Sequence, residues 1–231
     1  MATNEVVVAG STISASQMKD LWRQIGDGSL TNHHIQALLE HRDPFTISMD
    51  VASQIGRWRQ LFAEVDIQID VDSVQIPDRR PGFDRLIVVP SGLTLNRLVE
   101  ILRQKFTVWL WAEDLDSAVV NNDRSNTQAY AIWVRDRIEA DEELKNLSAV
   151  MLAKQGVRGQ TLMERLLHEW VYFSRTRQHL DVKNVTLCSA SRDSDGGVPR
   201  VYWGTGDRRL QVNWCGAGGR DDDLRPRAVV S

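Results

Sequence analysis

Hydrophobic and polar residues alternate in the last part of the chain, from residue 185 to residue 230. A period of two is typical of a β-strand with one buried and one exposed face, because successive side chains point to opposite sides of a sheet. The apolar set is Val201, Trp203, Leu210, Val212 and Trp214, and the set between them is Arg200, Tyr202, Gln211, Asn213 and Cys215. We therefore predict a small antiparallel sheet at the C-terminus. Trp203, Val212 and Trp214 should be buried in it, and Arg200, Gln211 and Asn213 should be exposed.

Apolar residues recur at spacings of three and four in much of the remaining chain, which predicts helices. The clearest helix runs from Thr161 to Arg177, where Thr161 and Glu164 have the T-x-x-E spacing of a capping box. The other predicted helices cover two stretches within residues 14–42 and the ranges 51–64, 94–105, 139–144 and 147–154. Strands are predicted at 86–89, 107–111 and 128–134, so that a β-α-β pattern is followed by a polar loop at 114–126 and a further strand.

Three chain-breaking residues, Pro77, Pro81 and Gly82, mark a junction after the first helices. We therefore divide the chain into a helical N-terminal segment, residues 1–76, and an α+β domain, residues 77–231. The alternating strands of residues 185–231 end that domain. The predicted fold class is α+β, with helices first and a small antiparallel sheet last.

The charge balance does not favour a nucleic-acid partner. The 231 residues include 28 basic and 31 acidic ones, a formal net charge of -3, whereas nucleic-acid binding depends on a basic surface that neutralises phosphates. No apolar run approaches the length that spans a bilayer, and the first residues lack the basic end and long apolar stretch of a signal peptide. We therefore expect no nucleic-acid partner, no membrane insertion and a cytoplasmic location by default. Surface display by another route and homo-oligomerisation stay open.

Metal-ligating residue types are present, but not in a suitable pattern. Cys188 and Cys215 are too few for a disulfide scaffold or a zinc site, and a disulfide between them is the less favoured alternative. The spacing of Asp66, Asp70 and Asp72 fits an acidic edge strand better than a calcium loop, since the glycine and the closing carboxylate of such a loop are missing. The sequence therefore predicts no metal ion and no cofactor.

Candidate catalytic groups are limited to one charged stretch. Arg135, Asp136 and Glu139 lie close together in sequence and could line a cleft, which would make the chain an enzyme of unknown type. Charges of this kind more often form surface ion pairs or complement the start of a helix. No phosphate-binding glycine loop and no nucleophile elbow accompany them. We therefore name no catalytic residue and keep an enzyme as an alternative.

Five short stretches form a series in the C-terminal part of the chain. They are the strand Thr186–Arg192, the paired strands VPRVYW and LQVNW, the loop GGRDDD and the closing strand LRPRAVV. This series resembles the C-terminal part of a C-type-lectin-like fold, in the form shared by formylglycine-generating enzymes and the variable proteins of diversity-generating retroelements. The whole chain is also similar to a group of uncharacterised bacterial proteins that share stretches such as AYAIWVRDRIEADEELKNLSA and HLDVKNVTLC.

The resemblance implies a binding protein rather than a catalyst. The enzymes of that group use two cysteines close together, whereas Cys188 and Cys215 are far apart in this sequence. Calcium-dependent lectins hold sugar with a Glu-Pro-Asn or Gln-Pro-Asp triplet, which this chain lacks. The variable-protein branch remains, and it implies a rigid scaffold that presents exchangeable surface residues to a protein or other macromolecular ligand.

The ligand-binding residues expected on this basis lie on the exposed side of the C-terminal strands and in the loops beside them. They are Arg200, Tyr202, Thr205, Asp207, Arg209, Gln211, Asn213, Cys215, Asp221 and Asp222. Tyrosine and arginine are among the side chains that contribute most to binding at protein interfaces. The expected function is therefore that of a ligand-binding display protein. The alternatives are the enzyme described above and an assembly protein that docks a partner through its N-terminal helices.

Overall fold

The computed structural model describes residues 14–26 and 50–231 of the chain. The chain divides into two compact units, Met1–Ser48 and Met49–Ser231. In the first unit, helix α1 (Ala15–Gly26) has no buried residue, and Trp22 is 65% exposed. The second helix predicted within residues 14–42 lies outside the described residues.

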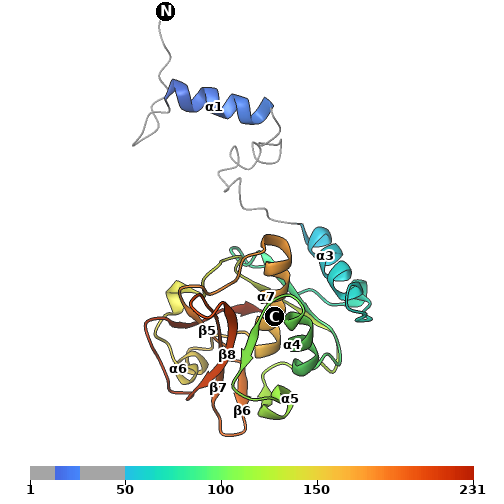
Figure 1. Ribbon diagram of the computed structural model, residues 1–231, viewed down its shortest axis with the longest axis vertical. Coiled ribbons are helices and arrows are strands. Elements are labelled where there is room, and N and C mark those ends of the chain that lie inside the picture. Colours follow the sequence, from blue (N-terminus) through green and yellow to red (C-terminus); the bar gives the residue numbers. More distant parts are fainter. Residues whose placement is uncertain (1–13, 27–49) are drawn as a thin grey trace, which may run out of the picture. The chain divides into compact units, whose positions relative to one another are not determined.

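The second unit combines helices with three sheets, which confirms the predicted α+β class. Its helices are α3 (Val51–Ala63), α4 (Leu95–Arg103), α5 (Leu115–Ala118), α6 (Ala149–Lys154) and α7 (Leu162–Thr176), with the 3₁₀ turns η1 (Val71–Ser73) and η2 (Glu142–Leu144). Its strands are β1 (Arg85–Val89), β2 (Val108–Leu110), β3 (Val119–Asn122), β4 (Tyr130–Val134), β5 (Val185–Leu187), β6 (Ser191–Asp193), β7 (Val198–Gly204), β8 (Arg209–Cys215), β9 (Leu224–Pro226) and β10 (Val229–Val230). In Figure 1, α6 and α4 are seen to either side of strands β7 and β8.

The strands form sheets with the orders β1-β4-β10, β2-β8-β7-β5-β9 and β3-β6. In the five-stranded sheet β2 runs parallel to β8 and β9 runs parallel to β5, whereas the β7–β8 and β5–β7 pairs are antiparallel. The C-terminal sheet is therefore mixed and larger than the small antiparallel sheet predicted. The two strands of the predicted β-α-β pattern belong to different sheets. β1 pairs antiparallel with β4, whereas β2 joins the five-stranded sheet.

Helix α7 lies in the main core and begins where the sequence predicts. The Thr161 hydroxyl accepts a hydrogen bond from the Glu164 N–H, and the Glu164 carboxylate accepts one from the Thr161 N–H, which completes the capping box. The helix is closed by Arg177, whose backbone is left-handed with φ 58°. It packs against β1 and α4, and Leu166 and Trp170 are fully buried. The clearest helix of the sequence is thereby confirmed.

Helix α3 belongs to the same core as the sheets. Trp58 is 1% exposed and donates a hydrogen bond from Nε1 to the Leu86 carbonyl at 2.9 Å. Gln54 Oε1 accepts a hydrogen bond from the Leu86 N–H. The unit that carries the sheets therefore begins at Met49, not at residue 77, because the apolar face of this helix is buried against β1. The stretch with Pro77 is a connection inside this unit.

Two stretches between the main elements differ from their predicted structure. Residues 114–126, predicted to be a loop, contain α5 and β3, with Leu115 and Val119 buried. The stretch predicted to be an acidic edge strand forms η1 instead, and the carboxylate of Asp70 caps that turn. These elements are three or four residues long, which is shorter than the window over which periodicity becomes visible.

Four charged side chains are buried together between α7 and the C-terminal strands. Arg165 pairs with Asp181 at 2.8 Å and with Glu169 at 2.9 Å, and Arg227 pairs with Asp181 at 2.7 Å. None of the four is more than 1% exposed. Burial works to raise the pKa of Asp181, but Arg227 and Arg165 outweigh it and hold this pKa below its usual value. Asp181 is therefore ionised beside these two arginines, and we call the four residues the buried ion network.

His168 lies on α7 close to this network and has no counter-charge. The ring is fully buried, its Nδ1 lies 3.5 Å from Gln160 Nε2, and its Nε2 has no hydrogen-bond partner. Burial, followed by the positive charges of Arg227 and Arg165, holds the pKa of His168 well below 6.5. The folded protein therefore keeps this ring neutral under conditions in which the unfolded chain protonates it.

We expect the fold to lose stability as the pH falls below 6.5, since the unfolded histidine then binds a proton that the folded one does not bind. The free energy of unfolding should fall by up to about 1.4 kcal/mol per pH unit. Urea unfolding at about pH 7.5 and about pH 5.5 measures this, and His168→Gln should remove the contribution. A variant that loses as much stability over this interval as the wild type would show that another group is responsible.

Candidate functional site

The β7–β8 hairpin carries most of the predicted ligand-binding residues. The strands pair antiparallel, with Arg200 opposite Asn213 and Tyr202 opposite Gln211. Residues opposite each other point to the same side of a sheet. The hairpin therefore has an apolar inner face and a second face that carries these four residues, which we call the outer face.

The inner face of the hairpin packs on the main core. Val201, Leu210 and Val212 are fully buried, as the alternation predicts. Trp203, which was predicted to be buried, is only half-buried, and its ring stacks on that of His179 with the centroids 3.4 Å apart. These residues anchor the hairpin and hold the outer face in place.

Trp214 continues the inner face but is 49% exposed, so the prediction that it is buried is wrong. It lies opposite Pro199 near the end of β8, and neither residue belongs to the main core. The end of β8 therefore extends beyond the main core that buries the rest of its inner face. Alternation shows on which side of a strand a residue lies, but it does not show where the core under that side ends.

A second, smaller core covers one end of the outer face. Val198 and Leu187 are buried there with apolar residues of α6. Tyr202 and Cys215 pack at the border of this cluster and remain partly exposed. Two of the predicted ligand-binding residues therefore also support the fold.

Gln211 is only 6% exposed, so the prediction that it faces solvent is wrong. β8 is an interior strand, and Gln211 lies between Trp109 on β2 and Tyr202 on β7. These two large side chains flank the amide on the same face. The Gln211 Nε2 also donates a hydrogen bond to Asp207 at 3.0 Å. The amide is therefore held in place by its neighbours.

Arg200, Arg209 and Asn213 remain partly exposed on the outer face, which also carries Trp109. Trp109 is 37% exposed, and the Arg209 guanidinium lies 5.9 Å from the centre of one of its rings. Arg209 also pairs with Asp207 at 3.0 Å. Arg200 makes no ion pair with any residue of the described ranges, and its buried Nε has no hydrogen-bond partner. The outer face therefore presents a cation that has no ion-pair partner among the described residues.

Trp109 is a residue of this face that the sequence did not reveal. Its strand is predicted, and Val108 and Leu110 on either side of it show the alternation. Its place beside Gln211 depends on the parallel pairing of β2 with β8, which lies far later in the chain. No local pattern identifies such a partner strand.

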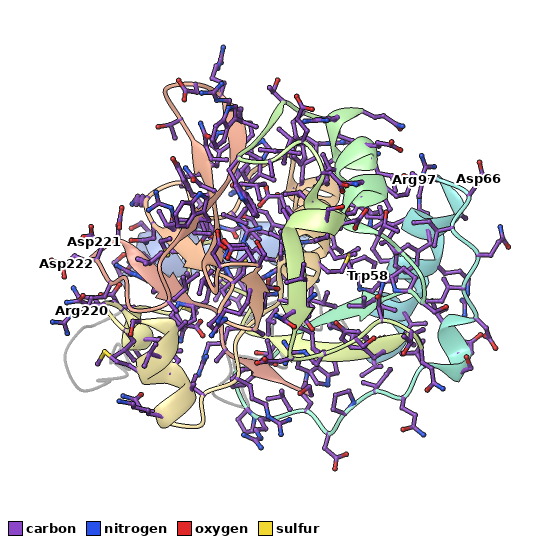
Figure 2. All side chains as sticks on the ribbon, turned by 90° about the horizontal axis from the view of Figure 1, so that it is seen from below. Trp58, Asp66, Arg97, Arg220, Asp221 and Asp222 are labelled. Atoms are coloured by element: carbon purple, nitrogen blue, oxygen red, sulfur yellow. The ribbon has the colours of Figure 1, made fainter. Side chains whose placement is uncertain are left out.

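The other predicted ligand-binding residues lie at the two ends of the hairpin. Thr205 and Asp207 are exposed in the turn between β7 and β8. Asp221 and Asp222 are exposed in the loop that follows β8, and Figure 2 shows both projecting outward beside Arg220. The turn and the loop leave opposite ends of the hairpin. The predicted ligand-binding residues therefore do not form one compact site. They lie on the outer face and in two exposed segments, one at each end of the hairpin.

Neither cysteine takes part in a disulfide. Burial raises the pKa of both thiols, and the nearby charge of Arg200 offsets only part of this rise for Cys215. Both thiols are therefore protonated at neutral pH, and a protonated thiol is a poor nucleophile. Cys215 contributes a small, half-buried side chain to the outer face.

The charged stretch considered for catalysis does not converge on one cleft. Burial works to raise the pKa of Asp136, but Arg85 at 2.5 Å and Arg175 at 3.3 Å hold this pKa below its usual value. Arg135 and Glu139 line two different hollows, of about 630 and 570 Å³. These charges belong to separate contacts of the fold, which favours the ion-pair interpretation of this stretch.

No family model, no curated protein and no solved structure matches this chain. Within residues 14–26 and 50–231, no helix is long and apolar enough to cross a membrane. In the same residues no group of three or more His, Cys, Asp and Glu side chains is placed to hold a metal ion. A function therefore has to be inferred from the geometry of the outer face.

Proposed function

We propose that the chain is a ligand-binding display protein of the kind found among the variable proteins of diversity-generating retroelements. Its C-terminal domain, of the C-type-lectin-like type, holds a protein or other macromolecular ligand on the outer face. The observation that carries the proposal is the unpaired guanidinium of Arg200, which lies beside Tyr202 and Asn213. Arginine and aromatic side chains supply much of the binding energy at protein interfaces. A carboxylate of the ligand would satisfy this guanidinium.

The division of the hairpin into a buried inner face and a partly exposed outer face supports a display role. Val201 and Val212 are fully buried, so exchanging them would disturb the core. Arg200, Arg209 and Asn213 are partly exposed and can be exchanged at little cost to the fold. A reverse transcriptase gene beside the coding sequence, with an imperfect second copy of the segment for residues 185–231, would accompany such exchange.

Arg200→Glu is expected to abolish capture of the natural ligand from a host or environmental lysate and to leave folding intact. The substitution places a negative charge where the ligand meets the guanidinium, and a change at a partly exposed position shifts stability by only about 0.5 kcal/mol. Quantitative pull-down measures the captured protein, and a thermal melt of each variant measures the fold.

Arg103→Glu is the matched control, because it makes the same charge change at an exposed position of α4. This variant should capture the ligand as the wild type does. If Arg200→Glu melts normally and retains the same protein in the same amount, the ligand does not bind at the outer face.

A further inference from the structure

The five-stranded sheet contains three arginines, and Arg200 is the one that has no ion-pair partner among the described residues. Arg209 pairs with Asp207, and Arg225 pairs with Glu142. No acidic residue lies in any of the five strands, all of which are described. The sheet therefore carries one positive charge that no described carboxylate offsets.

Asn213 adds a second hydrogen-bond donor on the same side of the sheet. It lies directly opposite Arg200, and both side chains are partly exposed. The Asn213 Oδ1 accepts a hydrogen bond from the Trp214 N–H at 2.9 Å. This contact fixes the orientation of the amide and leaves Nδ2, which is a donor, without a partner in the described part of the chain. A guanidinium and an amide N–H group are donors that suit a carboxylate.

Trp109 gives the outer face an exposed apolar surface on the edge strand β2. The Arg209 guanidinium lies 5.9 Å from the centre of one of its rings. Asp207 Oδ2 accepts hydrogen bonds from both Arg209 and Gln211, each at 3.0 Å. The polar neighbours of the indole are therefore held by one another. An indole that is 37% exposed contributes binding energy when an apolar side chain of a partner covers it.

The strand register determines how far apart Arg200 and Trp109 lie. Gln211 is the neighbour of Trp109 on one side and of Tyr202 on the other, and Tyr202 is two positions from Arg200. A displacement of two strands and two positions corresponds to about 12 Å at the usual strand spacing and rise. Residues i and i+4 of an extended chain face the same side and lie about 13 Å apart. One extended segment can therefore reach both residues.

We propose that the outer face binds an extended segment of a partner protein whose acidic residue contacts Arg200 and whose apolar residue, four positions away, covers Trp109. The inference rests on the proposed ligand-binding function of this face and specifies the chemistry of the partner. Charge complementarity selects the acidic residue, because the sheet supplies no carboxylate to Arg200. Arginine and tryptophan are also the side chains that most often dominate binding at protein interfaces.

The test uses the full chain as the target and a random linear peptide library displayed on phage as the probe. Peptides enriched by the wild type and not by Arg200→Glu should carry an acidic residue and an aromatic or aliphatic residue four positions apart. Selection on Arg200→Glu should instead enrich lysine or arginine at the acidic position, because the charge of the site is reversed. An enriched peptide is then synthesised, and fluorescence polarisation measures its affinity.

Arg200→Glu and Trp109→Ala should each weaken binding of the synthesised peptide by at least about tenfold. Arg103→Glu and Trp214→Ala are the matched controls, since both residues are exposed and lie on α4 and on the inner side of β8. Both controls should bind the peptide as the wild type does. Replacing the acidic residue of the peptide by glutamine, or its apolar residue by serine, should also weaken binding by at least about tenfold. These changes in the peptide leave the fold of the protein untouched.

The inference is overturned if no enriched peptide depends on both Arg200 and Trp109, or if exchange of the acidic residue leaves the affinity unchanged. It is also overturned if the protein sediments as a dimer that Arg200→Glu dissociates, since a second copy would then occupy the outer face.

A failure of this inference can be distinguished from a failure of the proposed function. If the peptide selection fails while Arg200→Glu abolishes capture of the natural ligand, the outer face binds a ligand of different chemistry. If the selected peptides depend on both residues while capture is unaffected by Arg200→Glu, the peptide site is supported and the natural ligand binds elsewhere.

Discussion

Asp181→Asn is expected to lower the free energy of unfolding by about 3–5 kcal/mol. The side chain is fully buried, and its two oxygens pair with Arg165 and Arg227. The amide keeps the size of the side chain but removes its charge. Arg165 retains Glu169, whereas Arg227 loses its anionic partner and remains buried. An uncompensated buried charge is costly because the protein interior solvates it far less than water does.

Urea unfolding of Asp181→Asn measures this loss, and Asp222→Asn serves as the control at an exposed carboxylate. The control should change stability by no more than about 0.5 kcal/mol. Adding Arg227→Met to Asp181→Asn removes the unpaired charge and should recover at least about 1 kcal/mol. If Asp181→Asn is no less stable than the control, the buried ion network does not stabilise the fold.

The acid side of the stability profile gives a second readout of the same residue. Because the pKa of Asp181 is held below its usual 3.8, the ionised form contributes its full stabilisation above that pH. The contribution is lost as the pH falls through the lower, folded pKa. Asp181→Asn should therefore flatten the profile in strong acid. The loss due to His168 begins at higher pH, so the two effects can be separated.

The long elements of this fold could be predicted because their signals are local. In α7, the capping box at Thr161 and the repeated apolar positions lie within one stretch of sequence. The sequence also showed the apolar face of α3, but it did not show which strand this face packs against. Trp58 packs on the strand that contains Leu86, and the prolines between them suggested a domain boundary where the structure has none.

The outer face was predictable in part, for a different reason. Alternation assigned Arg200 and Asn213 to the correct side of the hairpin, because side-chain direction is a property of each strand. Exposure depends on neighbours from other strands, and these decide that Gln211 is covered while Trp214 is not. Strand pairing between distant segments therefore determines what each face can bind.

Trp58→Ala is expected to cost about 3–5 kcal/mol of stability, through the cavity left by the indole and the lost burial of its apolar surface. The side chain is 1% exposed, stacks on Phe62 with centroids 5.2 Å apart, and donates a hydrogen bond to the Leu86 carbonyl. Trp214→Ala is the matched control, since it removes the same side chain from a position that is 49% exposed.

Urea unfolding of both variants distinguishes the two views of where the sheet-bearing unit begins. If α3 is part of that unit, Trp58→Ala lowers the midpoint of one cooperative transition, while Trp214→Ala shifts it by about 0.5 kcal/mol or less. If α3 instead belonged to a separate N-terminal segment, the transition of the sheets would keep its midpoint in Trp58→Ala. A large loss confined to Trp58→Ala would therefore place the start of the folded unit before α3, because only a side chain inside a cooperative core can lower the stability of all of it.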